Sequence, residues 1–418
     1  MNKRHFIPLF ISSLIAWWIG SGLLPLLPIY ATKLGASPAL VGNYLSIVYL
    51  MLASGTASAG WLASKLQRRR GLFILSSVVC VPATYLMGQA TNIWQLTILT
   101  SIVWFAAGGG LTLLAILTGR LAEAGQRGKL FGALALTTAL GGLLGGFTTG
   151  PIADHWGYPT LFGVLSFLWL GQIVSGLFLR DKTASDHPSD HPSDHTLVSE
   201  QRLHQPIVLS RRFLQLLMVN LLAGTAVFVL LMGQSLAMNG LGFSASAITI
   251  ISAISGIVGV GLNPLMGRLS DRIHRGLLLS ITYVGSALAL VTVALASSLF
   301  DFAVVALLVA VQGAGAAIGA ALVADVLGQD ALDRGMGFFD AAKWAGGICG
   351  FAGTGYAVQI LGLQTTLLAG ALLPLLAVAM LALTLIGNPS MSTGSQRLGS
   401  NHLVTVLRTV LRRRQASV

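Results

Sequence analysis

The chain has 418 residues and a formal net charge of +12, with 54% hydrophobic and only 9% charged residues. Soluble domains have about 25% charged residues, so this composition and a mean hydropathy of +0.79 exclude an ordinary soluble domain. The cations lie in short clusters between apolar runs rather than in one patch. This distribution favours membrane topology over nucleic-acid binding.

Long apolar runs fill most of the chain. A bilayer core of about 30 Å requires about 20 apolar residues per helix, and the first run is too long for a signal peptide. The predicted spans are 6–31, 39–63, 71–90, 94–118, 129–152, 159–179, 213–238, 245–266, 276–296, 302–325, 335–360 and 363–386. We therefore predict an all-α integral membrane protein with twelve transmembrane helices in two six-helix bundles.

Four regions follow from these spans. They are an N-terminal bundle (1–179), a cytoplasmic linker (180–212), a C-terminal bundle (213–387) and a cytoplasmic basic tail (388–418). Lysine and arginine gather on one side of the spans, while the other side has Lys33 alone. Because cytoplasmic loops carry excess Lys and Arg, we expect both termini in the cytoplasm. The expected location is the cell (inner) membrane, as a lipid-embedded, multi-pass monomer.

A basic hairpin after the second predicted span of each half shows an internal repeat. Gly60 begins the first hairpin and Gly267 begins the second, 207 residues later. Gly108 and Gly315, in another predicted span of each half, have the same offset. One offset shared by independent features indicates that the two bundles are related by internal duplication.

This two-half plan, with a basic hairpin in each half, resembles the major facilitator superfamily and its hairpin pattern Gly-x-x-x-Asp-Arg-x-Gly-Arg-Arg. The second hairpin matches the pattern at Gly267, Asp271, Arg272 and Arg275. The first keeps Gly60 and Arg68 but has Ser64 where the family has aspartate. The resemblance implies a secondary carrier that works by alternating access, with its site near the membrane midplane between the halves.

The resemblance also implies that these hairpins act as a conformational latch. In the family, the hairpin carboxylate faces the positive end of a neighbouring helix, and the contact breaks and reforms during transport. Ser64 supplies a hydroxyl but no charge, which implies a weakened first latch and a normal second one. The alternative is that both hairpins only fix the topology through their positive charge.

The chain resembles drug-efflux members of the family, with one departure. Many of those members carry an arginine in the fourth helix, where this chain has Trp104. The first acidic residue of the chain is Glu123, so predicted helices 1 to 4 contain no carboxylate that could bind a proton or a cation.

Asp340 and Lys343 are the ionisable pair placed well inside a predicted span. Three residues apart, they share one face of the eleventh helix. Charges inside a membrane are costly and suggest function, so both are coupling candidates, with Asp340 as the proton site. The alternative is that Lys343 extends toward the cytoplasmic interface and Asp340 only neutralises it.

Polar and aromatic residues on the helices that line the pathway in this family are the cavity candidates. They are Trp17, Trp18, Ser21, Asn43, Tyr44, Tyr49, Trp104, Asn220, Gln234, Asn263 and Gln312. Each taken alone is also explained by helix packing or by an interfacial position. Few charges and many rings favour a neutral or amphipathic organic substrate over a phosphate or dicarboxylate, which would favour arginine near the midplane.

The sequence offers no enzyme, metal or cofactor site. Every histidine lies outside the predicted spans, and neither a phosphate-binding loop nor a nucleophile elbow is present. The repeat at 185–195 could bind Zn²⁺ or Ni²⁺ weakly, but a disordered linker is the simpler interpretation. Residues 403–414 of the tail have the spacing of a short amphipathic helix at the membrane surface.

The expected function is secondary active transport of a small organic molecule, in the form of proton-coupled export of an amphipathic compound. Uptake or facilitated exchange of a polar metabolite such as a sugar is the first alternative. A non-transporting membrane receptor or assembly factor is the second. The expected partners are the substrate, protons and membrane lipids, and not nucleic acid.

Overall fold

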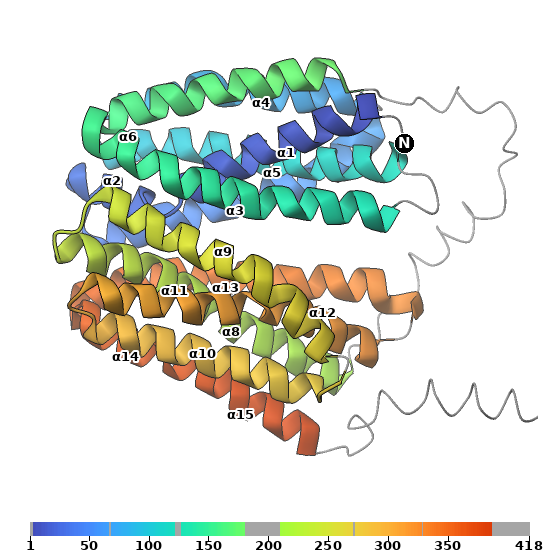
Figure 1. Ribbon diagram of the computed structural model, residues 1–418, viewed down its shortest axis with the longest axis vertical. Coiled ribbons are helices and arrows are strands. Elements are labelled where there is room, and N and C mark those ends of the chain that lie inside the picture. Colours follow the sequence, from blue (N-terminus) through green and yellow to red (C-terminus); the bar gives the residue numbers. More distant parts are fainter. Residues whose placement is uncertain are drawn as a thin grey trace, which may run out of the picture.

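The computed structural model describes residues 3–66, 68–121, 127–179, 210–270, 272–327 and 329–386. Within these ranges every element is a helix. Figure 1 shows two bundles of long helices, the N-terminal half in blue to green and the C-terminal half in yellow to red. The predicted all-α architecture is confirmed. Asp271, the repeat in the linker and the amphipathic segment of the tail lie outside the described residues.

The N-terminal bundle consists of α1 (Lys3–Leu23), α2 (Leu27–Lys33), α3 (Pro38–Leu66), α4 (Arg69–Met87), α5 (Ile93–Leu121) and α6 (Arg127–Leu177). The first predicted span is broken into α1 and α2. Pro25 and Pro28 explain this break, because the residue before a proline is disfavoured in a helix and a proline lacks a backbone donor.

The fifth and sixth predicted spans are joined in α6 at a sharp kink. The kink lies at Gly157, whose φ is 80° and ψ 168°. This left-handed conformation is accessible to glycine because it has no Cβ. One residue therefore reverses the chain at the membrane surface where a loop was expected.

The C-terminal bundle consists of α8 (Arg211–Gly240), α9 (Ala245–Ser270), α10 (Arg275–Leu295), α11 (Leu299–Gly313), α12 (Gly315–Val326), α13 (Gln329–Leu361), α14 (Leu363–Gly370) and α15 (Leu372–Ile386). The tenth predicted span is interrupted between α11 and α12, where Gly313 and Gly315 flank the break. The twelfth is interrupted between α14 and α15.

Ten helical segments of the described chain are long and apolar enough to cross a membrane. One of them, within α6, holds two of the predicted spans on either side of Gly157. The remaining predicted span is α13, where Asp340, Lys343 and several glycines lower the hydropathy. The twelve-span prediction is therefore confirmed.

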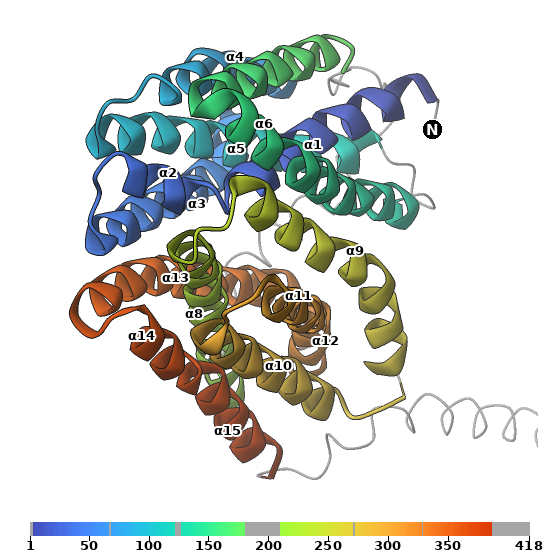
Figure 2. The same cartoon turned by 60° about the vertical axis from the view of Figure 1, so that its left-hand side comes forward.

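The two halves meet through equivalent helices. The second span of each half contacts the fifth span of the other half. Helix α3 packs on α13, and α9 packs on the part of α6 before Gly157. The duplication predicted from the 207-residue offset therefore appears as an approximate twofold relation between the two contacts. Figure 2 shows α9 lying against α6 at one end and spreading away from it toward the other.

Candidate substrate pathway

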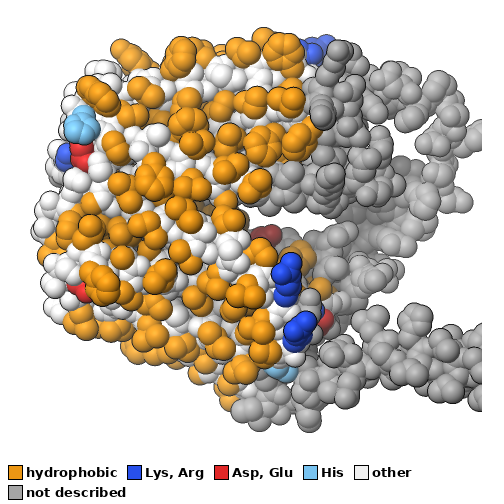
Figure 3. Space-filling model, in the orientation of Figure 1, with side chains coloured by type: hydrophobic (Ala, Val, Ile, Leu, Met, Phe, Trp, Pro, Cys, Tyr) orange, Lys and Arg blue, Asp and Glu red, His pale blue; other side chains and the backbone are white. Residues whose placement is uncertain are grey.

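The two halves separate at the end of the molecule where α6 ends and α8 begins (Figure 1 and Figure 2). At this end each half has a buried apolar cluster of its own, one around Leu117 and Leu179 and the other around Phe213 and Leu322. The largest cluster, by contrast, joins side chains of both halves. Figure 3 shows the molecule hollowed between the halves at this end, which we call the open end. The opposite end is the closed end.

One of the two contacts at the closed end is the seam between α3 and α13. A Cβ added to Gly42 would lie 2.8 Å from the Cα atom of Gly355, so the two backbones touch. The Asn43 amide donates to the Tyr356 hydroxyl at 2.9 Å, and the Ser46 hydroxyl donates to the carbonyl of Ile348 at 2.8 Å. This seam is held by close packing and neutral hydrogen bonds.

The other contact is the seam between α6 and α9. A Cβ on Gly146 would lie 2.7 Å from the carbonyl oxygen of Thr249, so these backbones also touch. The Asp154 carboxylate accepts hydrogen bonds from the backbone N–H groups of Ala245 (3.0 Å) and Ser246 (2.7 Å), and from the Ser246 hydroxyl. A carboxylate from the N-terminal half therefore caps the positive end of α9 in the other half.

Aromatic rings of α3, α8 and α13 fill the space next to the α3–α13 seam. Tyr49 of α3 lies 5.0 Å from Phe228 of α8 and 5.1 Å from Phe351 of α13, measured between ring centroids. Trp344 joins the cluster at 5.9 Å from Tyr49. All but Trp344 are buried. Tyr49, one of the sequence candidates, thus belongs to a plug between the halves.

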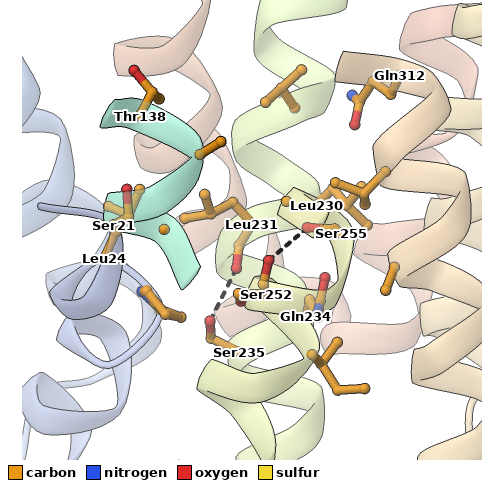
Figure 4. Close-up of a pocket in the computed structure, with 18 of the residues that line it drawn as sticks. Ser21, Leu24, Thr138, Leu230, Leu231, Gln234, Ser235, Ser252, Ser255 and Gln312 are labelled. Atoms are coloured by element: carbon orange, nitrogen blue, oxygen red, sulfur yellow. Dashed lines mark hydrogen bonds between the residues drawn. The ribbon is translucent and has the colours of Figure 1, made fainter. Parts of the chain in front are cut away.

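A pocket of about 410 Å³ lies between the halves, beside the α6–α9 seam. Its N-terminal wall comes from α1, the turn that follows α1, and α6, and it includes Ser21, Leu24 and Thr138. Its C-terminal wall comes from α8, α9 and α11 and includes Gln234 and Gln312. Figure 4 shows Ser21 and Thr138 on one side of the pocket and Gln312 on the other.

The described residues lining this pocket carry no ionisable side chain. Leucine, isoleucine, valine and alanine side chains form most of the wall, with serine and threonine hydroxyls and two glutamine amides between them. A charged ligand there would lose water without gaining a counter-charge. The pocket therefore suits a neutral molecule with a mainly apolar surface.

Asp340 and Lys343 lie on the part of α13 that faces the open end, away from the closed seams. Asp340 is exposed and Lys343 is half-buried, with its Nζ atom 5.7 Å from the ring centroid of Trp344. In the described structure no ion pair joins the two side chains. The contact expected from their spacing is thus not formed in this conformation.

Three of the candidates in the cavity prediction, Ser21, Gln234 and Gln312, line the pocket. Several others serve helix packing instead. Tyr44 bonds to Thr100 at 3.0 Å and is buried, and Trp104 is buried within the N-terminal half. The Asn220 amide donates to the carbonyl of Phe339 at 2.6 Å and joins α8 to α13.

The remaining cavity candidates lie elsewhere. Trp17 packs beside Gly141 of α6, and the Trp18 indole donates to the Thr148 hydroxyl at 2.9 Å. Asn43 belongs to the α3–α13 seam. Asn263 is exposed on α9 outside the pocket. Position on a pathway helix was therefore not enough to predict which face reaches the cavity.

The latch residues that the structure describes lie at the open end. Gly60 and Gly267 have no neighbouring atom within 4 Å of an added Cβ, and Arg68 and Arg272 are exposed. Arg275 forms an ion pair with Asp325 at 2.7 Å, within its own half. Ser64 lies in α3, and its side chain is outside the described part of the structure. These positions are spread over an end where the halves are apart.

Sequence reasoning missed the contact of Asp154 with α9 and the serines of that helix that line the pocket. Ser252 and Ser255 line the pocket with Gly256, and their spacing of three to four residues was a readable signal of one small, polar helix face. Asp154 lies between the fifth and sixth predicted spans. Its partners lie 91 and 92 residues away in the chain, so no local pattern could reveal them.

Two six-helix bundles around a central pocket, open at one end and sealed at the other, define a membrane carrier. The chain belongs to the Major Facilitator Superfamily, whose family model matches residues 9–318 and 216–416. This membership gives the protein a transport role.

Known proteins resemble the chain to different extents. "Multidrug resistance protein MdtG" of Salmonella choleraesuis (strain SC-B67) is 26% identical over 330 residues, which cover 75% of this chain and 78% of that protein. The solved nucleoside transporter NupG superposes with a TM-score of 0.77 at 16% identity, covering 92% of this chain and 99% of that one. A D-xylose-proton symporter gives 0.71 at 14% identity, covering 90% and 96%. The two structures show a shared fold alone.

Proposed function

We propose that this transporter exports a neutral, amphipathic small molecule by alternating access. The observation that carries the proposal is the pocket between the halves, whose described lining is apolar with neutral polar groups. The similarity to a protein named for multidrug resistance supports export. Uptake or exchange of a polar metabolite remains the alternative, favoured by the two glutamines in the pocket.

The direction of loading follows from the orientation proposed from the sequence. The open end is the end at which the chain's first described residue and the linker boundaries lie (Figure 1), and the excess of Lys and Arg assigns it to the cytoplasm. Substrate would enter the pocket from the cytoplasm in this conformation. Opening of both seams at the closed end would then release it outside.

Asp340 is the proposed proton site. Its exposure toward the open end allows proton exchange with the cytoplasm in this conformation, and its neighbour Lys343 supplies a positive charge one helical turn away. Movement of α13 relative to α3 and α8 would change the solvent around the carboxyl group, and with it the balance between burial and the lysine charge. A change of this kind is what couples a proton to a conformational cycle.

Inverted membrane vesicles test the proposed function. With an imposed proton gradient, acid inside, we expect accumulation of chloramphenicol, which is neutral and amphipathic, and no accumulation of ethidium, a permanent cation. Empty-vector vesicles give the baseline. Accumulation without a gradient, or uptake only in right-side-out vesicles, contradicts proton-driven export.

Substitutions at the coupling pair test the mechanism in the same vesicles. Asp340→Asn keeps the shape and removes titration, so we expect loss of gradient-driven accumulation with some passive exchange retained. The double change of Asp340→Asn with Lys343→Met removes both charges and controls for an unpaired lysine. Normal gradient-driven accumulation in the double variant contradicts a coupling role.

A further inference from the structure

Most polar groups around the pocket already have protein partners. The hydroxyls of Ser235, Ser252 and Ser255 donate to carbonyl oxygens of their own helices at 3.1, 3.2 and 2.7 Å. The Gln312 amide nitrogen donates to the Ser286 hydroxyl at 2.9 Å, which leaves its second N–H and its carbonyl oxygen. These bonds fix the side chains but reduce what they can offer a ligand.

Three polar side chains of the lining, those of Ser21, Thr138 and Gln234, form no hydrogen bond with any residue that the structure describes. Gln234 is the amide among them, and its side chain is half-buried. A primary amide has two donors and one acceptor. A ligand that displaces water from this amide must replace those bonds, because unpaired polar groups out of water are unfavourable.

The surroundings of Gln234 define the shape of the partner. Val227, Leu230, Leu231 and Gln234 recur at three- and four-residue intervals, so they form one face of α8, and all line the pocket. The amide therefore projects from an aliphatic surface, with Ser21 of α1 and Leu24, which follows α1, also lining the pocket. A flat, uncharged ring system would cover the aliphatic surface and bring its own polar edge to the amide.

We propose that Gln234 sets a preference among the neutral substrates by pairing with ring compounds that carry N–H and C=O groups side by side, as in a lactam or cyclic urea. This inference rests on the proposed function and names its preferred substrate class. The two planar groups form two parallel hydrogen bonds, one from each partner to the other. The Gln312 carbonyl oxygen accepts from a further donor of larger ligands.

Equilibrium dialysis of the detergent-purified full chain with two probes tests the proposal. The first probe is 2-quinolinone, a flat bicyclic lactam; the second is 1-methyl-2-quinolinone, in which a methyl group replaces the N–H hydrogen. We expect the lactam to bind about tenfold more tightly than its methylated form. Equal affinities, or no binding of the lactam, overturn the proposal.

Variants localise the effect. Gln234→Leu should bind both probes equally, whereas Gln234→Asn, which keeps an amide, should retain part of the preference. Gln89→Leu makes the same substitution at an exposed turn outside the pocket and should keep the full tenfold ratio. A Gln234→Leu protein that keeps this ratio overturns the proposal. If Gln234→Leu fails to fold, Gln234→Asn takes its place, and a full tenfold ratio in that protein overturns the proposal. Chloramphenicol export in vesicles is measured separately, so a failed specificity proposal remains distinguishable from a failed export proposal.

Discussion

The two seams at the closed end have the same place in the duplicated fold but different chemistry. Each joins the second span of one half to the fifth span of the other, and in each a pair of backbones touches at glycine. Beyond the glycines, the α3–α13 seam uses Asn43 and Tyr356 in a neutral bond. The α6–α9 seam ends instead in the Asp154 carboxylate at the N-terminus of α9.

This difference indicates which features of the two closed-end seams the duplication constrains. Close approach of the helices depends on backbone geometry, so it is kept in both copies. The bonds at the seam ends are side-chain contacts and have diverged. The α6–α9 seam should therefore respond to charge, and the α3–α13 seam should respond mainly to volume.

The largest expected effect comes from adding volume to the α3–α13 seam. In Gly355→Ala, the new Cβ would meet the carbonyl oxygen of Pro38 at 2.6 Å. Overpacking costs about 1–3 kcal/mol, which shifts the closed-to-open equilibrium of this end by roughly 5- to 150-fold. We expect a strong loss of transport with a normal amount of protein in the membrane.

Gly353→Ala is the matched control, on the same helix two residues away, where an added Cβ meets no atom within 4 Å. Because alanine favours helix by about 1 kcal/mol over glycine, this variant should be active and at least as stable in thermal unfolding. Equal behaviour of the two variants contradicts a volume-sensitive seam.

Removal of the charge from the α6–α9 seam should have the next largest effect. Asp154→Asn retains the shape but replaces a carboxylate that faces a helix N-terminus, an interaction worth about 0.3–1 kcal/mol at exposed positions. We expect the closed end to open up to about fivefold more often. Maleimide labelling of Ser46→Cys from outside measures this, in a protein whose Cys80 and Cys349 are first replaced by alanine.

Asp301 offers the control for that charge. Its carboxylate also accepts N–H bonds at the start of a helix, from Ser297 and Ser298 at 2.9 Å, but entirely within the C-terminal half. Asp301→Asn should leave the labelling of Ser46→Cys unchanged. Identical labelling rates in the Asp154 and Asp301 variants would argue against a charged gate.

A smaller effect is expected from the neutral bond of the α3–α13 seam. Tyr356→Phe removes the hydroxyl that accepts from Asn43, and an exposed neutral bond contributes about 0.5 kcal/mol. Labelling at Ser46→Cys should rise by about twofold or less. A rise larger than that of Asp154→Asn would reverse the proposed difference between the seams.

The smallest effect is expected at the open end. Asp325→Asn breaks the ion pair with Arg275. In this pair the Arg275 side chain is 29% exposed and the Asp325 side chain 49% exposed. Exposed pairs contribute about 0–1 kcal/mol, and this one lies within a single half. Thermal unfolding in physiological salt should change little, with unchanged labelling of Ser46→Cys. A marked rise in labelling would show that this pair affects the distant gate.

The sequence predicted the spans and the duplication because hydropathy and repeated offsets are properties of the chain itself. It predicted the pocket only in part. Gln234 and Gln312 reach it, but Tyr44 and Asn220 are occupied by Thr100 and Phe339 of neighbouring helices. Which face of a helix meets the cavity depends on its rotation in the bundle, and a single sequence does not specify that rotation.

The gate was still less accessible from sequence. The capping of α9 by Asp154 joins the two halves and exists only once they are docked. Likewise, Gly42 and Gly355 are ordinary membrane-helix glycines until their backbones are brought together.

The glycine contacts at the closed end also have a consequence for the thermodynamics of the cycle. Ordering a side chain costs conformational entropy, from zero for glycine to about 2 kcal/mol for long residues. Seams that close at Gly42, Gly146 and Gly355 immobilise few rotamers at those contacts. The equilibrium between the two ends should accordingly carry only a small side-chain entropy term from these contacts.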